Sequence, residues 1–289
     1  MHKIVTYARS VAPAVQDQIA QMTKENLTDL SMLGVPSGNL IYPLYQHTLS
    51  EEILLYIKRI GKMEADAPIR LVVAYADDTQ EVVVGFVLFL PVKQDHTACG
   101  LTYMAVGVEH RRKGIATDML SAVANESPHI ELTCFIDKVP VYESMGFHVI
   151  GVRDTQIVMN NRQDPSMGEM TTVFAEALFN TPQAQMIQHK LFKLHGMRKL
   201  REAEKRLDRL VDELKRTAQQ FIDERAQEIV LYRRPGATVE QNASGRFELR
   251  GVESIDCAGK TEKAVWAQAA RLIDKRIGTR LRFLPAGQV

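Results

Sequence analysis

Residues 101–117 read Leu-Thr-Tyr-Met-Ala-Val-Gly-Val-Glu-His-Arg-Arg-Lys-Gly-Ile-Ala-Thr and carry the strongest structural signal in the chain. An apolar strand, predicted at 101–108, runs into a turn with the pattern Arg-x-x-Gly-x-Ala, and a helix is predicted at 115–124. Free N–H groups at a helix N-terminus attract anions, and small residues let a phosphate approach the backbone. The turn therefore predicts a phosphate site. The alternative is a basic turn before an ordinary helix.

The segments around this stretch predict further strands and helices. Two apolar runs joined by Asp77-Asp78-Thr79-Gln80 have the signature of a hairpin. Ser50, followed by Glu51 and Glu52, is typical of a helix start. The predicted strands are 4–7, 70–76, 81–92 and 129–136, and the predicted helices are 11–33, ending before Gly34, and 49–60. This order indicates a mixed α/β layer.

A second motif, Tyr-Glu-x-x-Gly-Phe at 142–147, follows the predicted strand at 129–136. The two motifs in this order and setting resemble the acyl-CoA-binding motifs of the GNAT N-acetyltransferase superfamily, and Val84-Gly85-Phe86-Val87 resembles the third strand of that family. The resemblance covers roughly residues 1–160 of the chain. It implies an α+β fold, a mixed, mostly antiparallel sheet flanked by helices.

The resemblance also implies a cofactor, a reaction and site residues. Acetyl-CoA would be the co-substrate, without a metal, and the acceptor amine would attack the acetyl carbonyl directly. The backbone at Met104, Ala105 and Val106 would pair with the pantetheine arm and polarise the thioester carbonyl. Tyr142 would protonate the departing thiolate, or would simply pack on Phe147. The CoA pyrophosphate would be held, chiefly by backbone N–H groups, at Arg111, Arg112, Lys113, Gly114, Ile115, Ala116 and Thr117.

The chain departs from the family pattern in its acid–base residues. No Asn ends the strand before Tyr142, and Glu109-His110 replaces the frequent proline before the phosphate turn. Glu81, Glu109 and Glu131 are interpreted as solvated surface charges, so no general base is assigned. Cys134 is interpreted as a small core residue rather than a nucleophile.

The remainder of the chain matches no family that we recognise. Residues 161–180 have linker composition, and Thr181-Pro182 opens a long predicted helix over 181–232 with a break near Gly196. Residues 233–289 predict a small α/β element with strands at 246–252 and 280–283 and a helix at 261–277. Because a lone helix cannot bury its own apolar stripe, residues 181–232 predict a coiled coil or helical hairpin for homo-oligomerisation or docking. That stripe contains Leu200, Ala203, Leu207, Leu210, Leu214 and Phe221.

The net charge of +1 conceals two oppositely charged halves. Residues 1–181 contain 14 Lys and Arg against 21 Asp and Glu, whereas residues 182–289 contain 22 against 14. A nucleic-acid surface on the basic helix is less favoured than a solvated helix face. Cys99, Cys134 and Cys257 lie far apart, which argues against a disulfide framework or a zinc site and for a reducing, cytoplasmic compartment. The longest apolar run, 82–92, is too short to cross a membrane.

These observations favour an acetyl-CoA-dependent N-acetyltransferase acting on an unidentified amine. The alternative is a non-catalytic GNAT-fold assembly protein, for example a phage virion component whose basic helix packs against other subunits or nucleic acid. A third reading is a nucleic-acid-associated acetyltransferase anchored by the same helix.

Overall fold

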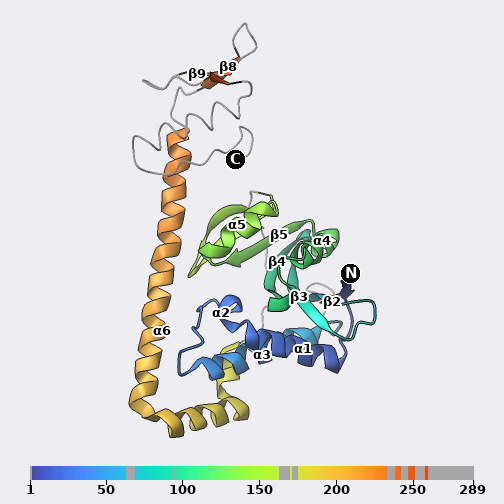
Figure 1. Cartoon of the computed structure of the whole chain (residues 1–289), viewed down its shortest axis with the longest axis vertical. Helices are drawn as coiled ribbons and strands as arrows, with labels where there is room; N and C mark the ends of the chain where they lie inside the picture. Colours follow the sequence, from blue (N-terminus) through green and yellow to red (C-terminus); the bar gives the residue numbers. More distant parts are fainter. Residues whose placement is uncertain are drawn as a thin grey trace. The chain divides into compact units, whose positions relative to one another are not determined.

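The computed structural model describes residues 2–62, 69–93, 95–162, 170, 175–232, 238–241, 247–250 and 258–259. Contacts divide the chain into two units, Met1–Ala218 and Gln219–Val289, and each is described by itself. Figure 1 labels the main elements along the chain. Among the described residues, no helix combines the length and apolar character needed to cross a membrane.

The first unit is built on a seven-stranded sheet with the order β1-β2-β3-β4-β5-β7-β6. All neighbouring strands are antiparallel except β4 and β5, which are parallel. The sheet confirms the predicted mixed, mostly antiparallel α/β fold. Its strands are β1 (Lys3–Tyr7), β2 (Arg70–Tyr75), β3 (Val83–Val92), β4 (Asp95–Val106), β5 (His129–Cys134), β6 (His148–Arg153) and β7 (Gln156–Asn160).

Helices cover both faces of this sheet, and so its central strands are apolar on both sides. Figure 1 shows α1 and α3 on one side of β2–β4 and α4 on the other. Phe86 of β3 is buried with α1 and α3, whereas a Cβ at its neighbour Gly85 would lie 3.1 Å from the Met119 side chain of α4. The helices are α1 (Pro13–Glu25), α2 (Leu27–Leu30), α3 (Tyr42–Arg59), α4 (Ile115–Glu126), α5 (Val139–Ser144) and α6 (Pro182–Tyr232), with 3-10 turns η1 (Val108–His110), η2 (Ile136–Lys138) and η3 (Ala175–Asn180).

The predicted helix at 11–33 is too long, because α1 ends at Glu25 and the helical backbone is interrupted at Asn26. The backbone there has φ −110° and ψ 19°, outside the helical region. The Asn26 side-chain amide donates to the Met22 carbonyl oxygen at 2.8 Å and satisfies an acceptor at the end of α1. The short helix α2 therefore leaves α1 in a new direction and forms one wall of the site described below.

The helix predicted at 49–60 begins earlier than its sequence signal, at Tyr42. Pro43 occupies the first turn, where its missing N–H group costs nothing. Ser50 lies inside the helix, where its hydroxyl donates to the Ala20 carbonyl oxygen of α1 at 3.4 Å. Ser50 is therefore an interhelical contact and not an N-cap.

Strands β6 and β7 were not predicted from the sequence. All residues of β6 before Arg153 are half-buried, so the strand lacks the alternation of a one-sided strand. All five residues of β7 are buried, but its two ends are the polar Gln156 and Asn160. The Thr133 hydroxyl donates to the Gln156 side-chain oxygen at 2.6 Å, which satisfies that buried amide.

Helix α6 consists of two arms joined at Gly196, where φ 74° and ψ 156° are not helical. This confirms the predicted break, and the Thr181 hydroxyl caps the first arm by accepting from the Ala184 N–H at 3.3 Å. In the second arm, Leu207 is buried against Leu27 and other apolar residues between α2 and α3.

The predicted apolar stripe thus has a partner within the chain along part of its length. Self-association through residues 181–232 stays a prediction.

The second unit contains a three-stranded antiparallel sheet with the order β10-β9-β8. Its strands are β8 (Thr238–Gln241), β9 (Phe247–Arg250) and β10 (Ala258–Gly259). The strand predicted at 246–252 is confirmed as β9. The predicted helix at 261–277, the predicted strand at 280–283 and Cys257 lie outside the described residues. The predicted linker, 161–180, is described only in part.

Candidate functional site

The site begins where the parallel strands β4 and β5 stop pairing. Their register runs from Ala98 opposite His129 to Leu101 opposite Leu132, whereas β4 continues to Val106. The register of β3 with β4 also shifts at this point, so that Thr102 is an extra residue in β4. A bulge of this kind bends a strand and increases its twist. The two strands therefore diverge and leave one edge of β4 without a β5 partner.

A cavity of about 1100 Å³ occupies this divergence, and nearly all the predicted site residues line it. Its walls come from α2, α3, β4, β5, the first turn of α4, and α5. Lys113 is the exception, because its ammonium group donates to the Glu109 carbonyl oxygen at 2.9 Å and is absent from the lining. The lining includes Met104, Ala105, Val106, Arg111, Arg112, Gly114, Ile115, Ala116, Thr117 and Tyr142.

The turn before α4 presents free backbone N–H groups to this cavity. Arg112 has φ 60° and Gly114 has φ 78°, both in the left-handed region. No side chain caps the N-terminus of α4, whose first helical hydrogen bond runs from the Asp118 N–H to the Gly114 carbonyl oxygen. The N–H groups before Asp118 therefore have no partner within the helix, and the helix dipole adds positive potential there.

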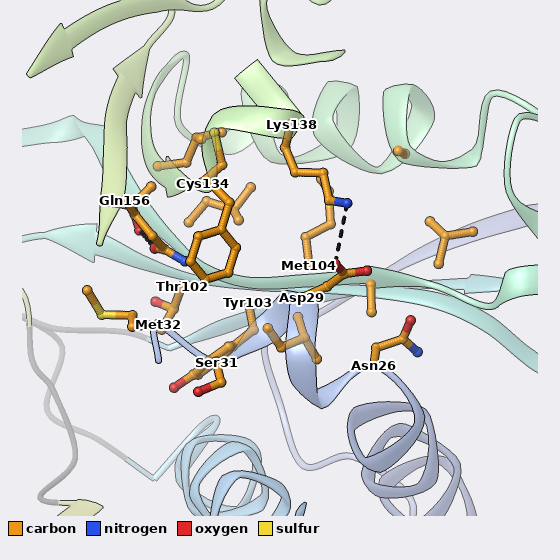
Figure 2. Close-up of a pocket in the computed structure, with 18 of the residues that line it drawn as sticks. Asn26, Asp29, Ser31, Met32, Thr102, Tyr103, Met104, Cys134, Lys138 and Gln156 are labelled. Carbon is orange, nitrogen blue, oxygen red and sulfur yellow. Dashed lines mark hydrogen bonds and ion pairs between the residues drawn. The ribbon is translucent and has the colours of Figure 1, made fainter. Parts of the chain in front are cut away.

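Arg111 is held by contacts to its own loop and to α2. Its guanidinium donates to the Asn26 side-chain oxygen at 2.6 Å and to the Val106 carbonyl oxygen at 3.2 Å. Asp29 of α2 lies 3.6 Å from the same guanidinium and 3.3 Å from the Lys138 ammonium group. Figure 2 shows Lys138 directed at Asp29. This carboxylate thus links the loop before α4 on one wall to the η2 segment on the other.

Tyr142 lies half-buried in α5 on the cavity wall. Its ring meets Phe147 edge-to-face, with ring centroids 5.8 Å apart. Burial first, and the nearby Cys134 second, raise the pKa of the Tyr142 hydroxyl. The hydroxyl has no hydrogen-bond partner among the described side chains and carbonyls. The Tyr142 hydroxyl is therefore protonated at physiological pH, and the ring makes the predicted packing contact with Phe147.

Glu52 of α3 is a cavity residue that the sequence interpretation missed. Its carboxylate accepts a 2.7 Å hydrogen bond from the Tyr103 hydroxyl of β4. Burial raises the pKa of the Glu52 carboxyl, and the Tyr103 hydrogen bond offsets part of that increase. The missed signal is helical spacing: with the helix extended to Tyr42, Glu52 shares the sheet-facing side with Leu49 and Tyr56.

One of the three glutamates interpreted as surface charges is instead mostly buried. The Glu131 side chain is only 16% exposed and lies 3.8 Å from the Arg153 guanidinium, on the cavity wall. It extends from β5 toward the neighbouring edge hairpin, and this cross-strand setting is not visible in a local pattern. Glu81 and Glu109 are exposed, as expected.

Burial disfavours a nucleophilic role for Cys99 and Cys134. Cys134 lines the cavity, and burial raises the pKa of its thiol to about 12. Cys99 is also free and buried, with a thiol pKa raised by burial to about 12. A nucleophilic cysteine requires the thiolate form, which these surroundings disfavour. Among the described residues, no group of three or more His, Cys, Asp or Glu side chains is arranged to hold a metal ion.

The comparison with known families identifies one segment of the chain. Residues 67–149 match the family model described as the acetyltransferase (GNAT) domain, and no curated protein sequence matches. The family match contains the diverging strands β4 and β5, the loop before α4 and Tyr142. It ends before β7 and does not include α6.

Several solved acetyltransferase structures are similar to the chain. Nourseothricin acetyltransferase is 20% identical, with a TM-score of 0.29, and the similarity covers 33% of this chain and only 65% of that protein. An aminoglycoside 6'-N-acetyltransferase complexed with coenzyme A is 18% identical, with a TM-score of 0.37, covering 57% and 99% of the two chains. Spermidine N-acetyltransferase from Vibrio cholerae, in complex with CoA and spermine, is 16% identical, with a TM-score of 0.38, covering 54% and 92%.

Proposed function

We propose that the protein is an acetyl-CoA-dependent N-acetyltransferase, because residues 67–149 match the family model described as the acetyltransferase (GNAT) domain. The observation that carries this proposal is the single cavity that joins the unpaired edge of β4, the uncapped N-terminus of α4 and Tyr142. An extended thioester cofactor with an anionic end requires these three features: an edge to pair with, an anion site and a proton donor.

The cofactor takes its position from charge and hydrogen bonding. The pyrophosphate meets the N–H groups at Gly114–Thr117, where the helix dipole and Arg112 favour negative charge. The pantetheine arm runs along β4 at Met104–Val106, whose edge lacks a β5 partner. Backbone N–H groups on that edge polarise the thioester carbonyl.

Acetyl transfer then needs one bond made, one bond broken and two proton movements. The lone pair of the acceptor amine attacks the thioester carbonyl carbon, and the carbon–sulfur bond breaks. The nitrogen releases its surplus proton to solvent, the thiolate takes a proton from the Tyr142 hydroxyl, whose raised pKa keeps it protonated, and the resulting tyrosinate takes up a proton from solvent.

Calorimetric titration of the full chain with CoA and acetyl-CoA tests cofactor binding. Arg112→Glu should weaken CoA binding, because it reverses a charge on the cavity wall. Lys113→Glu is the matched control: its ammonium group faces Glu109 and not the cavity, so the loss should be smaller. Absence of CoA binding at millimolar ligand would leave the non-catalytic assembly protein as the better description.

Thiol release from acetyl-CoA in the presence of amines tests the chemical step. Tyr142→Phe should lower kcat while leaving the CoA dissociation constant nearly unchanged, because it removes the hydroxyl group that donates the proton and keeps the ring. Unchanged turnover would remove Tyr142 from the mechanism and leave its packing on Phe147 as its role.

We also propose that residues 181–232 mediate self-association or docking. The large apolar side chains of the first arm support this proposal: Met186 is 72% exposed and Leu194 is 65% exposed. Light scattering on the full chain measures its mass in solution, and a monomer would contradict self-association.

A further inference from the structure

The part of the cavity next to α3 differs in chemistry from the phosphate end. Tyr45, Glu52 and Tyr56 lie seven and four residues apart on one side of α3 and line the cavity. Tyr103 approaches them from β4, with its ring edge-on to Tyr56 at a centroid distance of 6.4 Å. Figure 2 shows Tyr103 on the side of the strands that faces the N-terminal helices.

Two further walls of this region come from beyond the family match. The Phe179 ring of η3 meets the Tyr45 ring edge-to-face, with ring centroids 5.4 Å apart. The Gln188 side chain of α6 donates to the Phe179 carbonyl oxygen at 2.9 Å. Met170 lies directly over Gly100, where an added Cβ would clash with the Met170 sulfur atom. We call the space lined by Tyr45, Glu52, Tyr56, Tyr103, Met170 and Phe179 the acceptor chamber.

Glu52 is the carboxylate of the cavity without a cationic partner among the described residues. The other two carboxylates on the cavity wall are paired, Asp29 with Lys138 and Glu131 with Arg153. Glu52 has one hydrogen bond, from a neutral tyrosine, and aromatic neighbours. A half-buried carboxylate without a countercharge favours binding of a cation, and aromatic faces favour the same charge.

Building on the proposed acetyl transfer, we propose that the acceptor chamber binds a monoamine whose single ammonium group meets Glu52 and whose flat apolar body lies among the aromatic rings. One unpaired carboxylate matches one positive charge, whereas the further ammonium groups of a polyamine would meet cavity carboxylates, Asp29 and Glu131, that are already paired with Lys138 and Arg153. Glu52 receives the proton that the ammonium group releases, which frees the nitrogen lone pair for attack on the thioester. The raised pKa of the Glu52 carboxyl supports this proton transfer.

Calorimetry on the full chain saturated with CoA tests the proposal with phenethylamine, propylamine and spermidine as probes. Phenethylamine should bind at least about tenfold more tightly than propylamine, because its ring buries apolar area in the chamber. It should also bind more tightly than spermidine. Tighter binding of spermidine or equal binding of the two monoamines would overturn the proposal.

Substitutions separate the charge from the apolar wall. Glu52→Gln keeps the shape and an acceptor for Tyr103, and it should weaken phenethylamine binding by at least about tenfold. Glu51→Gln is the matched control, one residue away on α3 and outside the cavity lining. Phe179→Leu should weaken phenethylamine binding while CoA affinity is unchanged. Equal effects of the two glutamate variants would refute the role of Glu52, provided that neither variant melts at a lower temperature than the parent protein.

Failure of this proposal is distinguishable from failure of the acetyltransferase proposal. If CoA binds and thiol is released with spermidine but not with phenethylamine, the enzyme stands and the chamber assignment is wrong. If phenethylamine binds in a manner that depends on Glu52 but CoA does not bind, the chamber stands and the acetyltransferase proposal fails.

Discussion

Leu207→Ala tests whether the second arm of α6 is part of the folded first unit. Leu207 is only 4% exposed and packs with Leu27, Val35 and Ile41. The substitution removes three carbon atoms, worth about 2.4 kcal/mol at roughly 0.8 kcal/mol for each buried group. A residual cavity adds to this cost, so we expect the free energy of unfolding to fall by about 2–5 kcal/mol.

Thermal unfolding of the full chain, followed by circular dichroism, measures this effect. For a unit of this size, each kcal/mol lowers Tm by about 2–4 °C, so a decrease of about 5–10 °C or more is expected. Leu194→Ala is the matched control, because Leu194 lies in the same helix but is 65% exposed. Leu194→Ala should change the free energy of unfolding by no more than about 0.5 kcal/mol. Equal, small effects of both variants would refute the packing of α6 on α2 and α3.

Three further predictions concern the cavity and the buried thiols. Gly114→Ala should lower the free energy of unfolding by about 1–2 kcal/mol in urea titrations, because φ is 78° although nothing lies within 4 Å of the added carbon; no change would show that the turn relaxes. Glu52→Gln should raise Tm at pH 7.5, because burial raises the pKa of that carboxyl and its ionisation therefore costs folded-state stability. The gain should shrink as the pH falls toward about 4.5, where the carboxyl is protonated, and a gain that grows would contradict this sign. In a Cys257→Ala variant, Cys99 and Cys134 should react with Ellman's reagent at pH 8 more than about a thousandfold more slowly than in the unfolded chain, because both thiol pKa values are raised to about 12.

The phosphate loop and its strand and helix were predictable because their signal is local. The glycine at 114 serves a backbone with positive φ, and the basic residues precede a helix that begins at Ile115. Local sequence also contains the break at Gly196 and the cap at Thr181. Each of these features depends on a few consecutive residues, and their chemistry is nearly independent of the rest of the fold.

The part of the cavity next to α3 was not predictable in the same way. Glu52 has the sequence setting of a helix start, and only contact with Tyr103 of β4 places it in the cavity. Phe179 and Met170 reach the cavity from a segment with linker composition. Asp29 forms ion pairs with Arg111 and Lys138 because the backbone turn at Asn26 directs α2 toward these two residues. All these relations join residues far apart in sequence, which a single sequence without homologues does not reveal.

The position of β7 between β5 and β6 has a consequence for synthesis on the ribosome. Strand β6 emerges before β7, but its partner within the sheet is β7 alone. Until residues 156–160 have emerged, one edge of β5 is open and β6 is the nearest competitor for it. A nascent chain that pairs β5 with β6 would have to release that pairing before the cavity wall is complete. Slower translation while β6 has emerged and β7 is still inside the exit tunnel would prolong this interval, and synonymous codon changes that cause such a pause should affect the yield of folded protein without altering its sequence.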